Sequence, residues 1–141
     1  MESALDILLS KDPLNMDRAY AHVTSDATGG IAVFVGTVRD HTANKSVLRL
    51  DFSAYEPMAI KEMTKIGKQA LQRFDIQRIA IHHGIGSMEI GEKPVIIAVA
   101  SAHRQAAFEA CQFAIDTLKE TVPIWKKEYF EDGEVWVNAH P

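Results

Sequence analysis

The hydrophobic pattern of residues 101–128 is the most informative part of the chain. Apolar residues recur there at steps of three and four, the period of one helix face: Ala107, Phe108, Cys111, Ala114, Ile115 and Leu118. Ser101 is the expected N-cap, because its hydroxyl can accept from a free backbone N–H group of the first turn. Pro123 disfavours helix at the residue before it, so we expect the helix to end near Glu120 or Thr121.

Alternating and compact apolar patterns predict the other elements. Residues 47–55 alternate between two sets, Val47, Arg49, Asp51 and Ser53 against Leu48, Leu50, Phe52 and Ala54, which predicts a strand with one solvated face. Further strands are expected at residues 31–35, 77–82, 95–100, 124–130 and 134–138, and helices at 15–23 and 56–73. We expect a polar, mobile loop at residues 41–45 and a hairpin turn at Asp132-Gly133. Strands combined with two main helices predict an α+β fold rather than a regular doubly wound sheet.

Length and composition are those of one globular domain, residues 1–141. The net charge of −4 argues against nucleic acid as a partner. Cys111 is the only cysteine and lies on the apolar helix face, so an intramolecular disulfide is excluded and a buried thiol is favoured over a catalytic one. Acidic residues near the N-terminus and the lack of a long apolar run predict neither a signal peptide nor a membrane span. We therefore expect a cytoplasmic protein.

Cations stand at both ends of the predicted helix. His103 and Arg104 lie in its first turn, where side chains beside free N–H groups can bind a phosphate. An exposed arginine and a solvated histidine explain the same two residues equally well. Lys119 lies at the C-terminal end, a position that the helix dipole favours for any cation.

The strand after the helix adds a second lysine to this pattern. If that strand returns beside the helix end, Lys126 comes close to Lys119, and two nearby ammonium groups lower each other's pKa, which suits proton transfer at neutral pH. Arg39 follows an apolar strand and Gly36, and an arginine there can hold a phosphate through two hydrogen bonds. A surface arginine in a loop is the commoner case when Arg39 is taken singly.

Other chemical motifs are absent from the sequence. His82 and His83 are neighbours on a predicted strand and point to opposite faces, so they cannot readily chelate one metal, and no zinc-type spacing occurs. We therefore expect no metal site. Gly84 and Gly86 lack the third glycine of a dinucleotide fingerprint, and no paired carboxylates or serine triad stand out.

A series of short motifs, in order from about Gly29 to Val137, resembles the molybdopterin synthase catalytic (large) subunit family. The motifs are Phe34–Arg39 (FVGTVR), Tyr55–Ala59 (YEPMA), His82–Gly84 (HHG), Gly91-Glu92, Ser101–Arg104 (SAHR), Ala107–Ala110 (AFEA), Leu118-Lys119 and Pro123–Glu128 (PIWKKE). Each motif alone is modest, whereas the ordered set covers most of the chain and is specific.

The resemblance implies an α/β-hammerhead-like single domain with a mainly antiparallel sheet. It implies a sulfurtransferase of molybdenum cofactor biosynthesis that converts cyclic pyranopterin monophosphate into the dithiolene of molybdopterin. The sulfur would arrive as a thiocarboxylate on the C-terminal glycine of a small ubiquitin-like partner subunit, so the enzyme would need neither a cysteine nucleophile nor a cofactor. Two large subunits would form a central homodimer, with one small subunit at each end of a heterotetramer.

The resemblance also implies which residues form the site. Lys119 and Lys126 match the catalytic lysines of the family. Positions that match its substrate contacts are Thr37, Val38, Arg39, His103, Arg104, Lys119, Lys126, Lys127 and Glu128. The chain departs from the family at His83, where an arginine is common, and it stops at His140-Pro141, where the family often carries an arginine and further residues. Both departures bear on how the site binds anions.

The length of the helix separates its two cationic ends. His103 and Lys119 are sixteen positions apart, which is roughly 24 Å along a continuous helix, too far for one small pterin phosphate to bridge. We therefore predict that each site combines two chains, with Lys119, Lys126 and Arg39 from one and His103 and Arg104 from its dimer mate. Two other hypotheses stay open: a non-catalytic module that binds a phosphorylated metabolite for regulation, and a scaffold that only docks the small partner.

Overall fold

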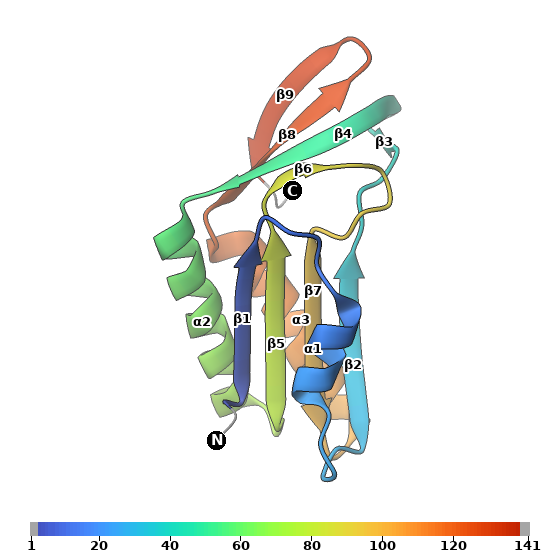
Figure 1. The fold of residues 1–141 in the computed structure, drawn as a ribbon. Coiled ribbons are helices and arrows are strands. Elements are labelled where there is room, and N and C mark those ends of the chain that lie inside the picture. Colours follow the sequence, from blue (N-terminus) through green and yellow to red (C-terminus); the bar gives the residue numbers. More distant parts are fainter. Residues whose placement is uncertain (1–2, 139–141) are drawn as a thin grey trace.

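A four-stranded sheet forms the centre of the fold (Figure 1). The structure, a computed structural model, describes residues 3–138. The strand order is β1-β5-β7-β2, with bounds Leu5–Ser10 for β1, Arg78–Gly84 for β5, Val95–Ser101 for β7 and Gly30–Gly36 for β2. Strands β1 and β5 run parallel, and the other neighbours are antiparallel.

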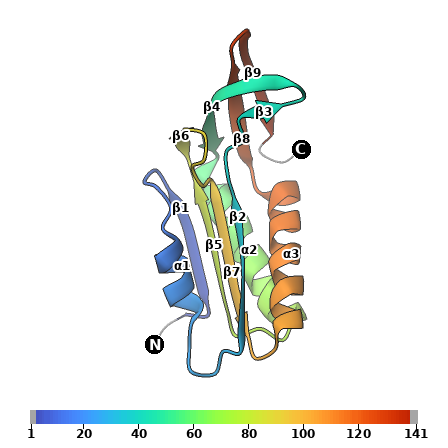
Figure 2. The ribbon, with the colours of Figure 1, turned by 90° about the vertical axis from the view of Figure 1, so that its right-hand side faces the viewer.

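Helices cover both faces of this sheet (Figure 2). Helices α2 (Glu56–Arg73) and α3 (Arg104–Thr121) pack on one face, and the shorter α1 (Met16–Val23) packs on the other. Every residue of β7 is buried, as expected for a strand that is covered on both sides. Large buried side chains fill the core beneath α2 and α3: Met63, Ile66, Ile79, Ile81 and Ile97.

A second, five-stranded sheet projects beyond the end of β5 (Figure 1). Its central strand is β4 (Lys45–Ala54), which pairs with β3 (His41–Thr42), with β8 (Ile124–Phe130) and with β6 (Gly86–Met88), and β8 pairs with β9 (Gly133–Asn138). All of these pairs are antiparallel. The expected α+β fold with mainly antiparallel pairing is confirmed, as are the helix at 56–73 and the hairpin turn before β9.

The start of α3 differs from the prediction. The helix begins at Arg104, and its N-cap is His103, whose side chain makes no capping hydrogen bond. Ser101 instead ends β7, where it is fully buried and its Oγ donates to the carbonyl of His103. The predicted Ser101 cap is therefore wrong, because the strand continues to that residue. The predicted C-terminal end is confirmed at Thr121.

Strand β4 contains an irregularity that alternation alone did not reveal. Its register against β8 shifts between Val47 and Arg49. As a result Val47 is buried, whereas Leu48, expected on the apolar face with Leu50, is 49% exposed. Residues 41–45 also differ from the expected loop: they belong to a β3–β4 hairpin whose turn residues, Ala43 and Asn44, have positive φ.

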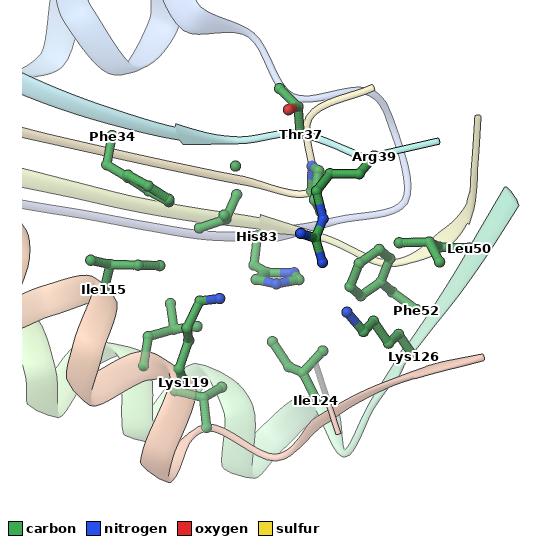
Figure 3. A pocket seen from close by; sticks show the side chains of 15 residues that line it. Phe34, Thr37, Arg39, Leu50, Phe52, His83, Ile115, Lys119, Ile124 and Lys126 are labelled. Atoms are coloured by element: carbon green, nitrogen blue, oxygen red, sulfur yellow. The ribbon is translucent and has the colours of Figure 1, made fainter. Parts of the chain in front are cut away.

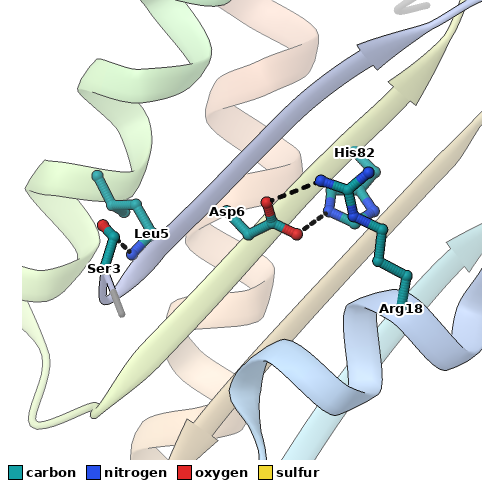
Figure 4. A network of polar contacts seen from close by, with 5 residues as sticks. All are labelled: Ser3, Leu5, Asp6, Arg18 and His82. Carbon is teal, nitrogen blue, oxygen red and sulfur yellow. Dashed lines mark hydrogen bonds and ion pairs between the residues drawn. The ribbon is translucent and has the colours of Figure 1, made fainter. Parts of the chain in front are cut away.

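Strand β1 was not among the elements predicted from the sequence. Leu5, Ile7 and Leu9 pack against the main core, and Asp6 between them faces α1 (Figure 4). This alternation is the signal that would have identified the strand. The carboxylate of Asp6 links β5 and α1: Oδ2 accepts a hydrogen bond from Nε2 of His82 at 2.8 Å, and Oδ1 accepts one from Arg18 at 3.2 Å.

This polar cluster fixes helix α1 to the sheet. Burial alone would raise the pKa of Asp6, but the hydrogen bonds from His82 and Arg18 outweigh it and hold the pKa below its ordinary value. Burial lowers the pKa of the fully buried His82 more than Asp6 raises it. This lowered pKa favours the neutral ring of His82. The bond to Asp6 places that ring on the α1 side of the sheet, and the neighbouring His83 points to the opposite face, as predicted for adjacent residues of a strand.

Candidate active site

A cavity of about 350 Å³ lies where the C-terminal end of α3 meets the second sheet (Figure 3). That volume is within the range of small-molecule sites. Its walls come from the end of β2, from β4, β5 and β8, and from the last turns of α3: Phe34, Gly36, Thr37, Arg39, Leu50, Phe52, His83, Pro94, Val95, Ile115, Leu118, Lys119, Val122, Ile124 and Lys126.

The fold brings three basic side chains to this cavity from three separate elements. Arg39 follows β2, Lys119 lies in the last turn of α3, and Lys126 lies on β8. Strand β8 returns antiparallel to β4, with Lys126 opposite Phe52, and this register turns Lys126 toward the same space as Lys119. Among the described residues that line the cavity, none is acidic. The cavity is therefore suited to an anion.

Lys126 has a perturbed ammonium group. Burial lowers its pKa, nearby Glu128 raises it, and the positive charges of Lys119 and Arg39 lower it further, so the pKa lies below the ordinary lysine value. The mutual effect of two lysines was expected from the sequence, but the larger cause is burial. A lysine of this kind releases its proton more readily than a solvated one.

His83 lines the cavity but was not among the site residues predicted from the sequence. It is 3% exposed, and its ring packs edge-on against Phe52 with centroids 5.5 Å apart. Burial lowers its pKa to about 4, with a further lowering from Lys119. The alternation of Ile79, Ile81 and His83 along β5 carries the signal, because it places His83 on the face that α2 and α3 cover.

Thr37 and Val38, two further residues implied by the resemblance, lie differently relative to the cavity. Thr37 lines the cavity. Val38 is buried and fixes the loop at residues 91–92, since its N–H donates to the Glu92 carbonyl and its own carbonyl accepts from Gly91, both at 3.0 Å. This anchoring positions Arg39, the next residue.

Glu128 and Lys127 lie outside the cavity wall. Glu128 is 6% exposed and accepts a hydrogen bond from Oγ1 of Thr42 at 3.0 Å. Lys127 is on the opposite face of β8 from Lys126, where it forms an ion pair with Glu134 at 3.0 Å and lies over the ring of Tyr129. The structure thus brings Glu128 to Lys126 electrostatically and directs Lys127 away from the cavity.

His103 and Arg104 lie at the far end of α3. They line a separate, open hollow with Gln105, Phe108 and Glu109. Phe108 was expected on the buried helix face, but it is 63% exposed, because the buried stripe passes through Ala107 and Ala110 instead. Within the described chain, the two cationic ends of the helix therefore serve different hollows, and their union in one site across a dimer stays a prediction.

Cys111 is a structural residue of the core. It is 7% exposed, and its Sγ lies 3.8 Å from the carbonyl oxygen of Ile97. Burial raises the pKa of its thiol to about 11, so a nucleophilic thiolate is disfavoured. Among residues 3–138, no group of three or more histidine, cysteine or acidic side chains is arranged to hold a metal ion.

Comparison with known proteins assigns the chain to a family. A family model described as the MoaE protein matches residues 9–121. The chain belongs to the MoaE protein family. The family inferred from the sequence motifs is thereby confirmed, since curated MoaE-type relatives are molybdopterin synthase catalytic subunits.

Individual relatives match almost the whole MoaE-family chain. The molybdopterin synthase catalytic subunit of Pyrococcus abyssi is 41% identical over 138 residues, which is 98% of this chain and 93% of that protein. The crystal structure of molybdopterin synthase from Staphylococcus aureus superimposes with a TM-score of 0.87 at 34% identity, covering 96% of this chain and 97% of the other. A chain from the complex of subunits 1 and 2 of molybdopterin-converting factor from Helicobacter pylori shares the fold, with a TM-score of 0.71 at 23% identity over 99% and 94% of the two chains.

In the part of the chain that the structure describes, no helix combines the length and the apolar character needed to cross a bilayer.

Proposed function

We propose that this chain is the catalytic subunit of a molybdopterin synthase. It would transfer sulfur from the C-terminal thiocarboxylate of a small ubiquitin-like partner to cyclic pyranopterin monophosphate and so form the dithiolene of molybdopterin. The observation that carries this proposal is the convergence of Arg39, Lys119 and Lys126 on one cavity of about 350 Å³. Both reactants are anions, and a cavity with three cations and no acid among the described residues of its wall suits them.

The anionic ends of the two reactants meet different cations in this proposal. Arg39 holds the phosphate of the precursor, together with His103 and Arg104 of the dimer mate. Lys119 holds the carbonyl of the thiocarboxylate. Lys126, whose pKa is lowered mainly by burial, orients the pterin or moves protons.

Each sulfur transfer needs one new bond and one hydrolysis. The thiocarboxylate sulfur attacks a side-chain carbon of the precursor and forms a C–S bond, while the C–O bond at that carbon breaks and its oxygen leaves on the phosphate or, after protonation, as water. The partner is then joined to the precursor through a thioester. Water then adds to the acyl carbon, and the ammonium group of Lys119 stabilises the oxyanion of the tetrahedral intermediate. The bond between acyl carbon and sulfur breaks, leaving a thiol on the precursor and a carboxylate on the partner. Two such rounds supply both sulfurs of the dithiolene.

Reconstitution tests the proposed reaction. The purified chain is mixed with thiocarboxylated small subunit and pterin precursor, and the product is oxidised to its fluorescent derivative. We expect turnover with the wild type and a large loss in Lys119→Ala, whereas Lys68→Ala, an exposed lysine on α2, keeps it. Binding without turnover would favour a regulatory module or a scaffold. Near-normal turnover of Lys119→Ala would refute the role given to that residue.

The shared site has its own test. Arg104 and Lys119 are fifteen positions apart on α3, roughly 22 Å, so one chain cannot bring both to one small ligand. Mixed dimers of Lys119→Ala and Arg104→Ala chains should recover part of the activity, because one of the two sites then keeps both residues. Verified mixed dimers without recovery would contradict the shared site, and failure of the chains to form dimers at all would contradict the homodimer and the heterotetramer built on it.

We also propose a cytoplasmic location for the protein. The chain has one cysteine, which is buried and free, and such cysteine usage suits a reducing compartment. Fractionation of cells that produce the protein tests this part of the proposal, and recovery in an oxidising compartment would contradict it.

A further inference from the structure

His83 holds a fixed position in the wall of the cavity. Its ring lies between the side chains of Lys119 and Lys126, with Arg39 on the side toward β2 (Figure 3). Contact with Phe52, at an interplanar angle of 68°, restricts rotation of the ring. A buried side chain held in this way presents the same ring atoms to every ligand that enters.

The backbone determines which nitrogen of His83 carries a hydrogen. Nδ1 lies 2.7 Å from the carbonyl oxygen of Gly84. A carbonyl oxygen only accepts hydrogen bonds, so Nδ1 must be the donor. In a neutral imidazole the other nitrogen then has a free lone pair, and a ring with a pKa of about 4 is neutral in all but about one molecule in a thousand at pH 7. Nε2 is therefore an acceptor.

The acceptor at Nε2 has no hydrogen-bond partner among the described residues. The cations around it offer donors only, and no hydrogen bond joins the described ones to the ring. Among the described residues on the cavity wall, Thr37 is the other side chain with an acceptor atom. Acceptors left open in a buried site usually meet a ligand or water.

We propose that His83 is a substrate-binding residue whose Nε2 accepts a hydrogen bond from an N–H donor on the heterocycle of the substrate. The inference rests on the proposed function, because a pterin-type ring carries such donors. The cations of the cavity serve the acceptor oxygens of the phosphate, and His83 serves the part of the molecule that donates. The histidine is too weak a base to retain a proton at neutral pH, so its role is recognition and not proton transfer.

Two substitutions separate this role from a structural one. In His83→Gln, the side-chain oxygen reaches the position of Nε2, but the bond to Gly84 is lost. In His83→Asn, the amide can keep the bond to Gly84, but the acceptor at the Nε2 position is lost. Affinities for cyclic pyranopterin monophosphate and for inorganic phosphate are measured by calorimetry on the full-length protein, after circular dichroism has shown that both variants are folded.

We expect His83→Asn to weaken precursor binding about tenfold, the effect of one hydrogen bond, and His83→Gln to stay within about threefold of the wild type. Inorganic phosphate should bind equally well to all three proteins. The reverse ranking of the variants would assign His83 a structural role and overturn the proposal. Lower turnover in the fluorescence assay with unchanged affinity would indicate that Nε2 accepts from Lys119 instead of from the substrate. That result would overturn the proposal too. A wild type that does not bind the precursor would instead refute the proposed function.

Discussion

Acid should destabilise this protein through His83 more than through an ordinary histidine. The pKa of the folded-state ring is about 4, below the ordinary value of 6.5, so the folded state prefers the neutral form. A depressed pKa contributes stability above the unfolded-state pKa, and that contribution is lost as the pH falls from 6.5 toward 4. The fall from 6.5 to about 4 corresponds to about 3 kcal/mol of unfolding free energy, of which about 2 kcal/mol is lost by pH 5.

Urea unfolding at pH 7 and at pH 5, followed by circular dichroism, measures this loss. Between the two pH values the wild type should lose about 2 kcal/mol more than His83→Asn, which has no titratable group at this position. His103→Asn, a replacement at an exposed position, is the matched control and should keep the wild-type pH dependence. Equal pH dependence in the wild type and His83→Asn would refute a buried neutral imidazole at the cavity wall, and with it the acceptor assigned to Nε2.

Three further outcomes follow from other groups. Asp6→Asn should lower the free energy of unfolding by about 2 kcal/mol at pH 7, because His82 loses a charge-assisted hydrogen bond. The pKa of Asp6 is held below its ordinary value of 3.8, so the difference should persist above that pH and shrink as the pH falls below it; Asp12→Asn, at an exposed position, should cost little in the same urea titration. Lys126→Arg keeps the charge but cannot release a proton, so turnover should fall about 100-fold with a smaller change in KM, and unchanged turnover would reduce Lys126 to a point charge. Cys111→Ser should retain turnover in the fluorescence assay, and a large loss would contradict the structural role of the thiol.

Sequence patterns located the elements whose causes are local. The helix at 56–73 was predicted at its true bounds, because its apolar period and the proline near its start lie within the segment. The pairing of Lys119 with Lys126 was also inferable, since Pro123 must end the helix and the period-two pattern that follows must return as a strand. Family motifs added the catalytic role predicted for these lysines, which spacing alone did not supply.

Features that depend on distant partners were not predictable in the same way. The shift in β4 that buries Val47 and exposes Leu48 exists only against β8, far along the sequence. From the sequence, His83 was considered and rejected as a metal ligand and was identified as a departure from the family. Its place in the cavity was not predicted, because it depends on how β5, α3 and β8 come together. Ser101 resembles a helix cap locally, but pairing with Gly30 of β2 keeps it in a strand.

The electrostatics of the cavity explain why a neutral ring is useful beside its cations. Arg39, Lys119 and Lys126 repel one another when no anion is bound, and this repulsion, added to burial, is what lowers the pKa of Lys126. Glu128 offsets part of it from outside the cavity wall. A fourth cation at position 83 would strengthen anion binding but would increase the repulsion in the empty protein. The neutral His83 avoids that cost, and its acceptor lets the site distinguish a phosphorylated heterocycle from phosphate alone.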